Sequence, residues 1–351
     1  MREVQYLDGL RTPYSVPMQI GRFEVVVNVN HRQLETIVKR YFAPFLVDEL
    51  RGGDALEIVG IQGDPLFDTA RMPSVGRVAK VPKICFYDRD EVRVIRKNRT
   101  GVLHYIYGDR FVAVGDLVRY PQQLLNLVST AYGHRLRKEG HVAIHASCVC
   151  GEEGALVFAG QSGSGKSSVS LALMEFGFDY VTNDRTFLRR QDGRGVLVAG
   201  VPKWPRVNPG TLLANERLRK LLSRAKDEQY SRMDPRELWW VEDKHDVPVE
   251  SVYGKGRLAL HSRLRTLYVL NWRQNRRPLR LREISQDRAS ELLSPFYKTD
   301  VYDAPPVEPG VQANLGEIVR GSQIIEVTGG VDIPRLLNLV VGAPSTARAT
   351  A

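Results

Sequence analysis

The sequence has few cysteines and no long apolar run. Three cysteines, Cys85, Cys148 and Cys150, occur among 351 residues. A sparse and odd number argues against a disulfide scaffold and indicates a reducing compartment. Nowhere do about eighteen apolar residues follow one another without interruption, so we expect no membrane span. The charged segment 1–9 lacks the apolar core of a secretion signal, and we therefore expect a cytoplasmic protein.

The chain also lacks the common signatures of nucleic-acid and metal binding. Its formal net charge is +10, but 40 acidic residues are interspersed among 50 basic ones. The densest basic run, residues 273–277, leads into alternating arginines and leucines, which is typical of a loop followed by a half-solvated strand. No zinc-finger spacing or aromatic ribonucleoprotein pattern accompanies it, so we expect no nucleic-acid partner. The Cys148-x-Cys150 spacing fits alternation along one strand better than a metal site.

One motif stands out against this background. Residues 160–168 read GQSGSGKSS and fill the pattern G-x-x-x-x-G-K-[ST]. The apolar run 155–159 predicts a buried strand before the motif, and the apolar spacing in 167–176 predicts a helix after it. A glycine-rich turn whose backbone N–H groups precede a helix N-terminus binds phosphate groups. A turn that binds nothing is the less favoured alternative.

The motif predicts a site for ATP and magnesium. Lys166 is expected to reach the outer phosphates, and the Ser167 hydroxyl is expected to ligate Mg²⁺. The nucleotide-binding residues are then Gly160, Gln161, Ser162, Gly163, Ser164, Gly165, Lys166, Ser167 and Ser168. The motif alone does not distinguish a kinase from a hydrolase, a switch or a motor.

The patterns along the chain predict an α/β protein with two domains. Residues 1–118 show short strands, one helical pattern at 31–50 and no catalytic signature, so we expect an N-terminal α/β accessory domain. Residues 119–342 contain the motif at 160–168, which we call the phosphate loop. Two strands joined by a short turn precede it, which favours a mixed sheet. Residues 343–351 are expected to form a disordered tail. Further elements are expected as strands at 78–81 and 142–149 and helices at 121–138, 212–226 and 311–320.

Four side chains are expected near the phosphate loop. His145 lies on the strand before the hairpin turn, and Asp184 ends the short strand that follows the loop helix. We expect this short strand and the strand before the loop to be adjacent in the sheet. Lys203 and Arg206 lie in a proline-rich turn after the next strand. Ligand sites in α/β sheets form outside strand ends, where a carboxylate can bind magnesium or accept a proton and cations can neutralise a phosphoryl group. The alternative roles are a core histidine for His145, a turn cap for Asp184, and ordinary surface charges for Lys203 and Arg206.

These residues and their spacing resemble the catalytic domain of the HPr kinase/phosphorylase family. The resemblance covers roughly residues 120–340 and rests on four segments: 145–147, the phosphate loop, 175–177 and 183–185. It implies a mixed-sheet α/β P-loop kinase core related to the nucleotide domain of phosphoenolpyruvate carboxykinase. Together with the motif and the proline-rich turn, it leads us to expect catalytic roles for His145, Lys166, Asp184 and Arg206, and a metal site at Ser167 and Asp184.

The chain departs from the family at three places. The family's Asp-Asp pair is Asn183-Asp184, so the role of proton acceptor falls on Asp184, on His145 or on neither. Ser168 stands where the family has glutamate. Residues 202–210 replace a glycine-rich signature. These departures disfavour HPr itself as the substrate.

The sequence therefore predicts an ATP- and Mg²⁺-dependent kinase. The expected acceptor is a hydroxyl group of a protein serine, a peptide or a small metabolite, with no membrane partner. The alternative is a catalytically weak, ATP-binding regulatory module that acts through a partner protein. Homo-oligomerisation is left open.

Overall fold

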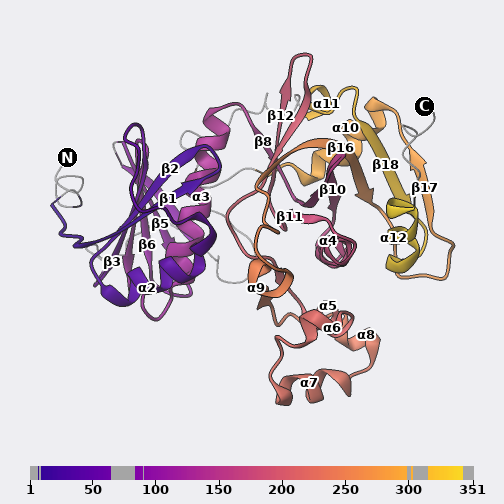
Figure 1. The fold of residues 1–351 in the computed structure, drawn as a ribbon, viewed down its shortest axis with the longest axis horizontal. Coiled ribbons are helices and arrows are strands. Elements are labelled where there is room, and N and C mark those ends of the chain that lie inside the picture. Colours follow the sequence, from indigo (N-terminus) through magenta and orange to yellow (C-terminus); the bar gives the residue numbers. More distant parts are fainter. Residues whose placement is uncertain are drawn as a thin grey trace. The chain divides into compact units, whose positions relative to one another are not determined.

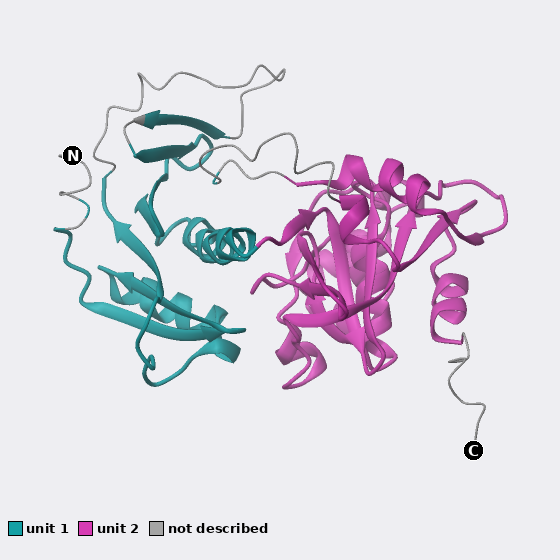
Figure 2. Ribbon diagram, turned by 90° about the horizontal axis from the view of Figure 1, so that it is seen from above, with its two compact units in different colours: residues 1–139, 299–307 teal, residues 140–298, 308–351 magenta. Residues whose placement is uncertain are grey.

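The computed structural model describes residues 7, 9–64, 84–89, 91–298, 302 and 315–342. The expected strand at 78–81 and the expected tail at 343–351 lie outside these residues. The chain divides into two compact units, residues 1–139 with 299–307 and residues 140–298 with 308–351 (Figure 2). No helix in the described part of the chain combines the length and the apolarity that a membrane span requires.

Unit 1 is built on a seven-stranded mixed sheet. Its strand order is β1 (Tyr14–Ile20), β2 (Phe23–Val29), β3 (Leu56–Gln62), β7 (Arg110–Gly115), β6 (Leu103–Tyr107), β5 (Val92–Lys97) and β4 (Ile84–Arg89). The helix expected at 31–50 is shorter, because α2 (Arg32–Tyr41) ends before Pro44, which lies in the 3-10 turn η1 (Ala43–Phe45).

The helix α3 (Gln122–Lys138) belongs to unit 1, although the expected boundary after residue 118 placed it with the phosphate loop. It packs on β3 and β7. The contact is close: a Cβ on Gly60 of β3 would lie 2.8 Å from the Leu124 side chain. The apolar face of α3 therefore completes the core of the first sheet.

Unit 2 contains the phosphate loop and a nine-stranded mixed sheet (Figure 1). The expected mixed α/β architecture is confirmed. The main path runs β11 (Asp179–Thr182), β9 (Ala146–Gly151), β10 (Gly154–Gly160), β16 (His261–Leu270), β13 (Gly195–Ala199), β12 (Thr186–Gln191) and β8 (Val142–Ile144). β18 (Gln323–Thr328) pairs with β16 and β17 (Arg280–Glu283).

The strand expected at 142–149 is broken at His145. β8 pairs antiparallel with β12, whereas β9 pairs antiparallel with β10 and β11. The two strands thus lie at different places in the sheet. The break leaves the His145 backbone outside both strands, and its N–H donates to the Phe296 carbonyl at 2.6 Å. The alternating apolar pattern continues through this position, so it did not signal the break.

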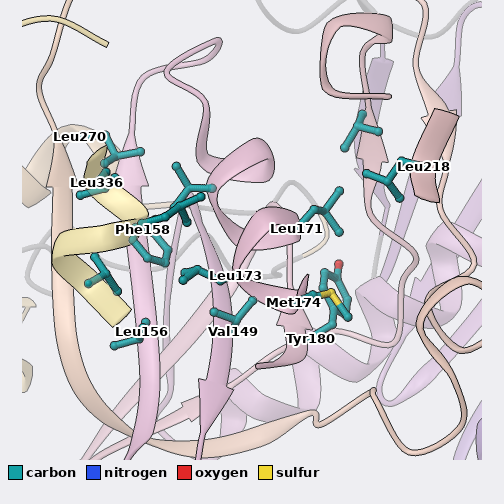
Figure 3. Close-up of a cluster of buried hydrophobic side chains, with 14 of the residues drawn as sticks. Val149, Leu156, Phe158, Leu171, Leu173, Met174, Tyr180, Leu218, Leu270 and Leu336 are labelled. Atoms are coloured by element: carbon teal, nitrogen blue, oxygen red, sulfur yellow. The ribbon is translucent and has the colours of Figure 1, made fainter. Parts of the chain in front are cut away.

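Two apolar clusters flank the sheet of unit 2. On one side, Phe158 and Leu156 of β10 pack against α4 (Lys166–Glu175) and α12 (Ile333–Val341), as Figure 3 shows. On the other side lie α10 (Gln286–Leu293), the 3-10 helix η3 (Ser294–Phe296) and α11 (Leu315–Ile318). The first part of the helix expected at 311–320 lies outside the described residues. The burial of apolar side chains on both faces stabilises the sheet, and the phosphate loop follows β10, one of its interior strands.

A helical segment interrupts unit 2 between β14 (Arg206–Val207) and β15 (His245–Asp246), which pair with each other. It comprises α5 (Pro209–Leu213), α6 (Glu216–Arg219), α7 (Arg224–Ser231) and α8 (Pro235–Leu238) and is followed by α9 (Val249–Tyr253) (Figure 1). We call residues 208–244 the helical excursion. The single helix expected at 212–226 is wrong, because Asn215 and Ser223 cap new helices within it.

Gly200, just after β13, is required by its close contact with β11. A Cβ at this position would lie 2.1 Å from the Val181 carbonyl oxygen and 3.0 Å from Thr182 Cβ. We expect Gly200→Ala to lower the free energy of unfolding of unit 2 by about 1–3 kcal/mol, the usual scale of overpacking. Chemical denaturation measures this change.

Gly210→Ala is the matched control, because a Cβ there would meet its nearest neighbour, Leu238, at an ordinary 3.8 Å. Equal stability of the two variants would contradict the packing argument.

Candidate nucleotide and phosphoryl-transfer site

The phosphate loop joins β10 to α4 with the backbone geometry that anion binding needs. Gly163 and Gly165 have φ angles of 77° and 85°, which only glycine adopts without strain. At the start of α4, no carbonyl of the described residues accepts from the N–H groups of Lys166, Ser167 or Ser168. Three unpaired N–H groups at a helix N-terminus form a site for a negatively charged oxygen.

The Lys166 side chain folds back onto the loop and binds its backbone carbonyls. Nζ donates to the carbonyl oxygens of Gly160 and Gln161, both at 2.9 Å, and the residue is 6% exposed. Burial lowers the pKa of Lys166 to about 8; the charge of Asp184 partly opposes this, while Lys298 and Lys244 add to it. The lysine thus stands in a site that disfavours its charge until an anion is present.

Buried side chains hold the loop in place. The Trp272 indole N–H donates to the Ser164 carbonyl at 2.8 Å. Ser147 Oγ donates to the Lys166 carbonyl at 3.0 Å and accepts from Ser170 Oγ at 2.7 Å. Sequence reasoning assigned no role to Trp272 or Ser147. The alternation of β9, which turns Ser147 to the side of the loop helix, was the available signal for the serine.

His145, Asp184 and Lys298 form the centre of the site. His145 Nδ1 lies 2.9 Å from Asp184 Oδ1, and Lys298 Nζ donates to Asp184 Oδ2 at 2.9 Å. The side chains of His145 and Lys298 are 26% and 29% exposed, and that of Asp184 is 55% exposed. The structure therefore brings together the two expected residues, His145 and Asp184, with a lysine that sequence reasoning missed.

The Asp184 carboxylate is held in its charged form. Partial removal from water opposes ionisation, but the hydrogen bond to His145 and the nearby charge and hydrogen bond of Lys298 outweigh it. The pKa of Asp184 is therefore well below its usual range. Its charge also acts on Lys166 and Lys203, so these two lysines belong to the same electrostatic cluster.

Lys298 reaches the site because of the break at His145. Phe296 accepts a hydrogen bond from the His145 N–H, and the Lys298 N–H donates to the Ala143 carbonyl at 2.9 Å. Residues 296–298 thus run beside the end of β8. No motif surrounds Lys298 in the sequence, and only this tertiary pairing identifies it.

The two residues of the proline-rich turn differ in their surroundings. Burial lowers the pKa of Lys203, and the charge of Asp184 acts in the opposite direction. Arg206 instead pairs with Asp246 through Nε at 3.0 Å, so its guanidinium is bound to another carboxylate. Its expected role in charge stabilisation stays a prediction.

One expectation about the strands is wrong. Asp184 and the phosphate loop were expected to follow adjacent strands, but β9 lies between β11 and β10. Because β9 is antiparallel to both neighbours, β11 and β10 run in the same direction and their carboxyl ends share one sheet edge. Asp184 still reaches the loop region across this strand.

The residues present fit a magnesium–nucleotide complex better than a metal held by protein alone. No group of three or more His, Cys, Asp or Glu side chains that could hold a metal occurs among the described residues. Mg²⁺ in nucleotide sites is bound by one or two protein ligands, phosphates and water. Ser167 Oγ makes no hydrogen bond with any described residue, which leaves it available as one such ligand.

Comparisons with known proteins find matches among solved structures but none by sequence. No protein family and no curated protein matches the sequence. Among solved structures, the Hpr(Ser) kinase/phosphatase from Coxiella burnetii matches with 11% identity and a TM-score of 0.30, over 57% of this chain and 94% of that chain. A likeness at this TM-score carries no argument about activity. The resemblance noted from the motifs therefore stays a prediction, and the site is interpreted from its own geometry.

We expect the hydrogen bond from Trp272 to stabilise the conformation of the phosphate loop. Trp272→Phe removes the indole donor to the Ser164 carbonyl while keeping most of the aromatic volume. A hydrogen bond contributes about 1 kcal/mol, so local opening should become about fivefold more frequent. Hydrogen exchange of peptides spanning 160–168 measures this. Trp240→Phe is the control, because Trp240 is 76% exposed, and equal exchange rates in both variants would refute the role of Trp272.

Proposed function

We propose that the chain is an ATP- and Mg²⁺-dependent kinase that phosphorylates a hydroxyl group. The observation that carries this proposal is the His145–Asp184–Lys298 cluster, whose carboxylate acts electrostatically on Lys166 of the phosphate loop. A loop with unpaired N–H groups and a buried lysine supports binding of a triphosphate. A histidine whose Nδ1 lies 2.9 Å from a carboxylate oxygen supports proton transfer during phosphoryl transfer.

The proposed step is a direct transfer. Magnesium-bound ATP supplies the γ-phosphoryl group when it is bound. The acceptor oxygen forms a bond to the γ-phosphorus as the bond from that phosphorus to the β,γ-bridging oxygen breaks, and ADP leaves with that electron pair. Lys166 and the N–H groups of Ser167 and Ser168 hold the phosphate oxygens. Ser167 and Asp184 are the proposed protein partners of the metal.

His145 is the proposed acceptor of the hydroxyl proton. Its Nδ1 faces Asp184, and Nε2 makes no hydrogen bond with any described residue. With the proton on Nδ1, Asp184 orients the ring, and Nε2 takes the proton from the attacking oxygen. This is the arrangement of a base held by a third group. Asp184 itself is the alternative base.

The regulatory alternative has its own support. Asn183 replaces one expected acid, and its amide donates to the Arg206 carbonyl at 3.4 Å. Both oxygens of Asp184 have cationic or histidine partners within the chain. A protein of this kind would bind ATP and pass the signal to a partner without transferring phosphate. Mass spectrometry of a metabolite extract or co-expressed proteins incubated with ATP separates the two functions, because only a kinase produces a phosphate gain.

We expect Lys166→Met to weaken ATP binding by at least about tenfold, because the ammonium is the cation closest to the loop carbonyls. Calorimetric titration with ATP and Mg²⁺ measures the affinity, and a melting curve tests the fold. Lys255→Met is the control, since Lys255 is an exposed lysine outside the site. Unchanged affinity in the folded Lys166→Met protein would rule out the proposed nucleotide site.

We expect Asp184→Asn to slow phosphoryl transfer by about two orders of magnitude or more, the scale of a lost acid–base group. His145→Gln should lower kcat similarly but leave the Mg²⁺ dependence of ATP binding unchanged, because Asp184 is a proposed metal partner and His145 is not. Asp192→Asn, an exposed turn residue, serves as the control. Near-normal transfer by Asp184→Asn would reduce Asp184 to a structural residue of the turn.

A further inference from the structure

The turn that carries Asp184 connects two strands with different partners. β11 before the turn pairs with β9, and β12 after it pairs with β8, so its ends belong to the two ladders that the break at His145 separates. Thr182 ends β11 and Thr186 begins β12, and both are 0% exposed. Thr182 Oγ1 closes the turn by donating to the Arg185 carbonyl at 3.0 Å. Hydrogen bonds of buried hydroxyl groups fix the chain around them.

Thr186 contacts the chain on both sides of His145. In the ladder between β12 and β8 it pairs with Ile144, the residue before His145. Its Oγ1 donates at 3.0 Å to the carbonyl of Ala146, the residue after His145. Thr186 is also the second residue after Asp184. One buried residue therefore spans the strand break and connects the backbone around His145 to the turn that carries Asp184.

The contact between His145 and Asp184 depends on this backbone geometry. His145 Nδ1 lies 2.9 Å from Asp184 Oδ1 and 3.1 Å from the Asp184 carbonyl oxygen. Carboxylate and carbonyl oxygens only accept hydrogen bonds, so both contacts favour a proton on Nδ1. The carboxylate can follow the ring by rotating about its side-chain bonds, whereas the carbonyl moves only with the backbone. The position of the turn relative to residues 144–146 thus helps to set the tautomer and the orientation of the imidazole.

On the basis of the proposed kinase function, we propose that Thr186 is a positioning residue for the base. The hydrogen bond from its hydroxyl to the Ala146 carbonyl holds His145 against the carboxylate and the carbonyl of Asp184. This contact keeps the proton on Nδ1 and leaves Nε2 for the acceptor hydroxyl. Thr186 is fully buried, so it acts on the reaction only through the two residues that it places.

The tautomer of the His145 ring tests this role without a phosphoryl acceptor. Long-range ¹H–¹⁵N NMR of the full chain with labelled histidine, recorded with the imidazole neutral, distinguishes a proton on Nδ1 from one on Nε2, and His145→Gln assigns the signals. We expect the Nδ1–H form in the wild type and in Thr186→Ser, which keeps the hydroxyl. In Thr186→Val, which removes only the donor, the ratio of the Nε2–H to the Nδ1–H form should rise about fivefold, the effect of one ordinary hydrogen bond.

Thr266→Val is the matched control, because it removes another buried hydroxyl from the same sheet, one that bonds Gln323 Oε1 at 3.0 Å. Thr186→Ala removes the same donor as Thr186→Val and serves if the valine variant does not fold. The proposal is wrong if the wild-type ring carries its proton on Nε2, if the ratio stays unchanged without the Thr186 hydroxyl, or if Thr186→Ser or Thr266→Val shifts it equally.

Phosphoryl transfer measures the kinetic consequence, with ATP labelled with ³²P at the γ-phosphate and a metabolite extract as the acceptor. We expect Thr186→Val to lower the rate at saturating ATP about tenfold and to change the KM for ATP less than about threefold, because a misplaced base slows the chemical step without disturbing the phosphate loop. An unchanged rate, or an equal loss in Thr266→Val, overturns the role. If the wild type transfers no phosphate, the kinase proposal fails, whereas the NMR ratio still decides whether Thr186 positions His145.

Discussion

The site depends on one constraint, the break in the strand at His145. If residues 142–149 formed one continuous strand, His145 would pair within the sheet and residues 296–298 would have no place beside β8. The break frees the His145 N–H for Phe296, and this contact carries Lys298 to Asp184. One interruption of a β-ladder thus joins three distant segments, around residues 145, 184 and 298. Polar backbone groups released by a break must find partners, and here those partners bring the charges together.

The charges around the phosphate loop favour the binding of an anion. Lys166 is buried against two carbonyl oxygens, and the nearest carboxylate, Asp184, is already paired with His145 and Lys298. The lysine therefore has only partial compensation for its lost hydration. An anion that enters the loop supplies the missing compensation and relieves the repulsion from neighbouring lysines. Because the loop is anchored by Trp272 and Ser147, this gain does not require the backbone to reorganise first.

The sequence predicted the local elements of the site and missed its tertiary partners. The phosphate loop between a strand and a helix, and Asp184 at a strand end, follow from local pattern and are present. The predicted loop helix, 167–176, included Phe176, yet this residue follows the last turn of α4 and is 53% exposed. Lys298 and Trp272 lie more than a hundred residues from the loop in sequence, and only strand pairing positions them. The break at His145 was also hidden, because its neighbours on both sides are apolar and buried in either arrangement.

Two residues at which the chain differs from the resembled kinase family, Ser168 and Asn183, contact the helical excursion or its base. Ser168, where that family has glutamate, bonds Thr211 of α5 at 2.7 Å. Asn183, where the family has aspartate, donates its amide to the Arg206 carbonyl at the base of the excursion. A carboxylate at 183 has no N–H to donate to that carbonyl, and a glutamate at 168 would place a longer, charged group against the Thr211 hydroxyl. Both replacements therefore fit a chain whose phosphate loop and Asp184 turn are attached to the excursion. An acidic residue at position 183 and this hydrogen bond to the base of the excursion therefore exclude each other.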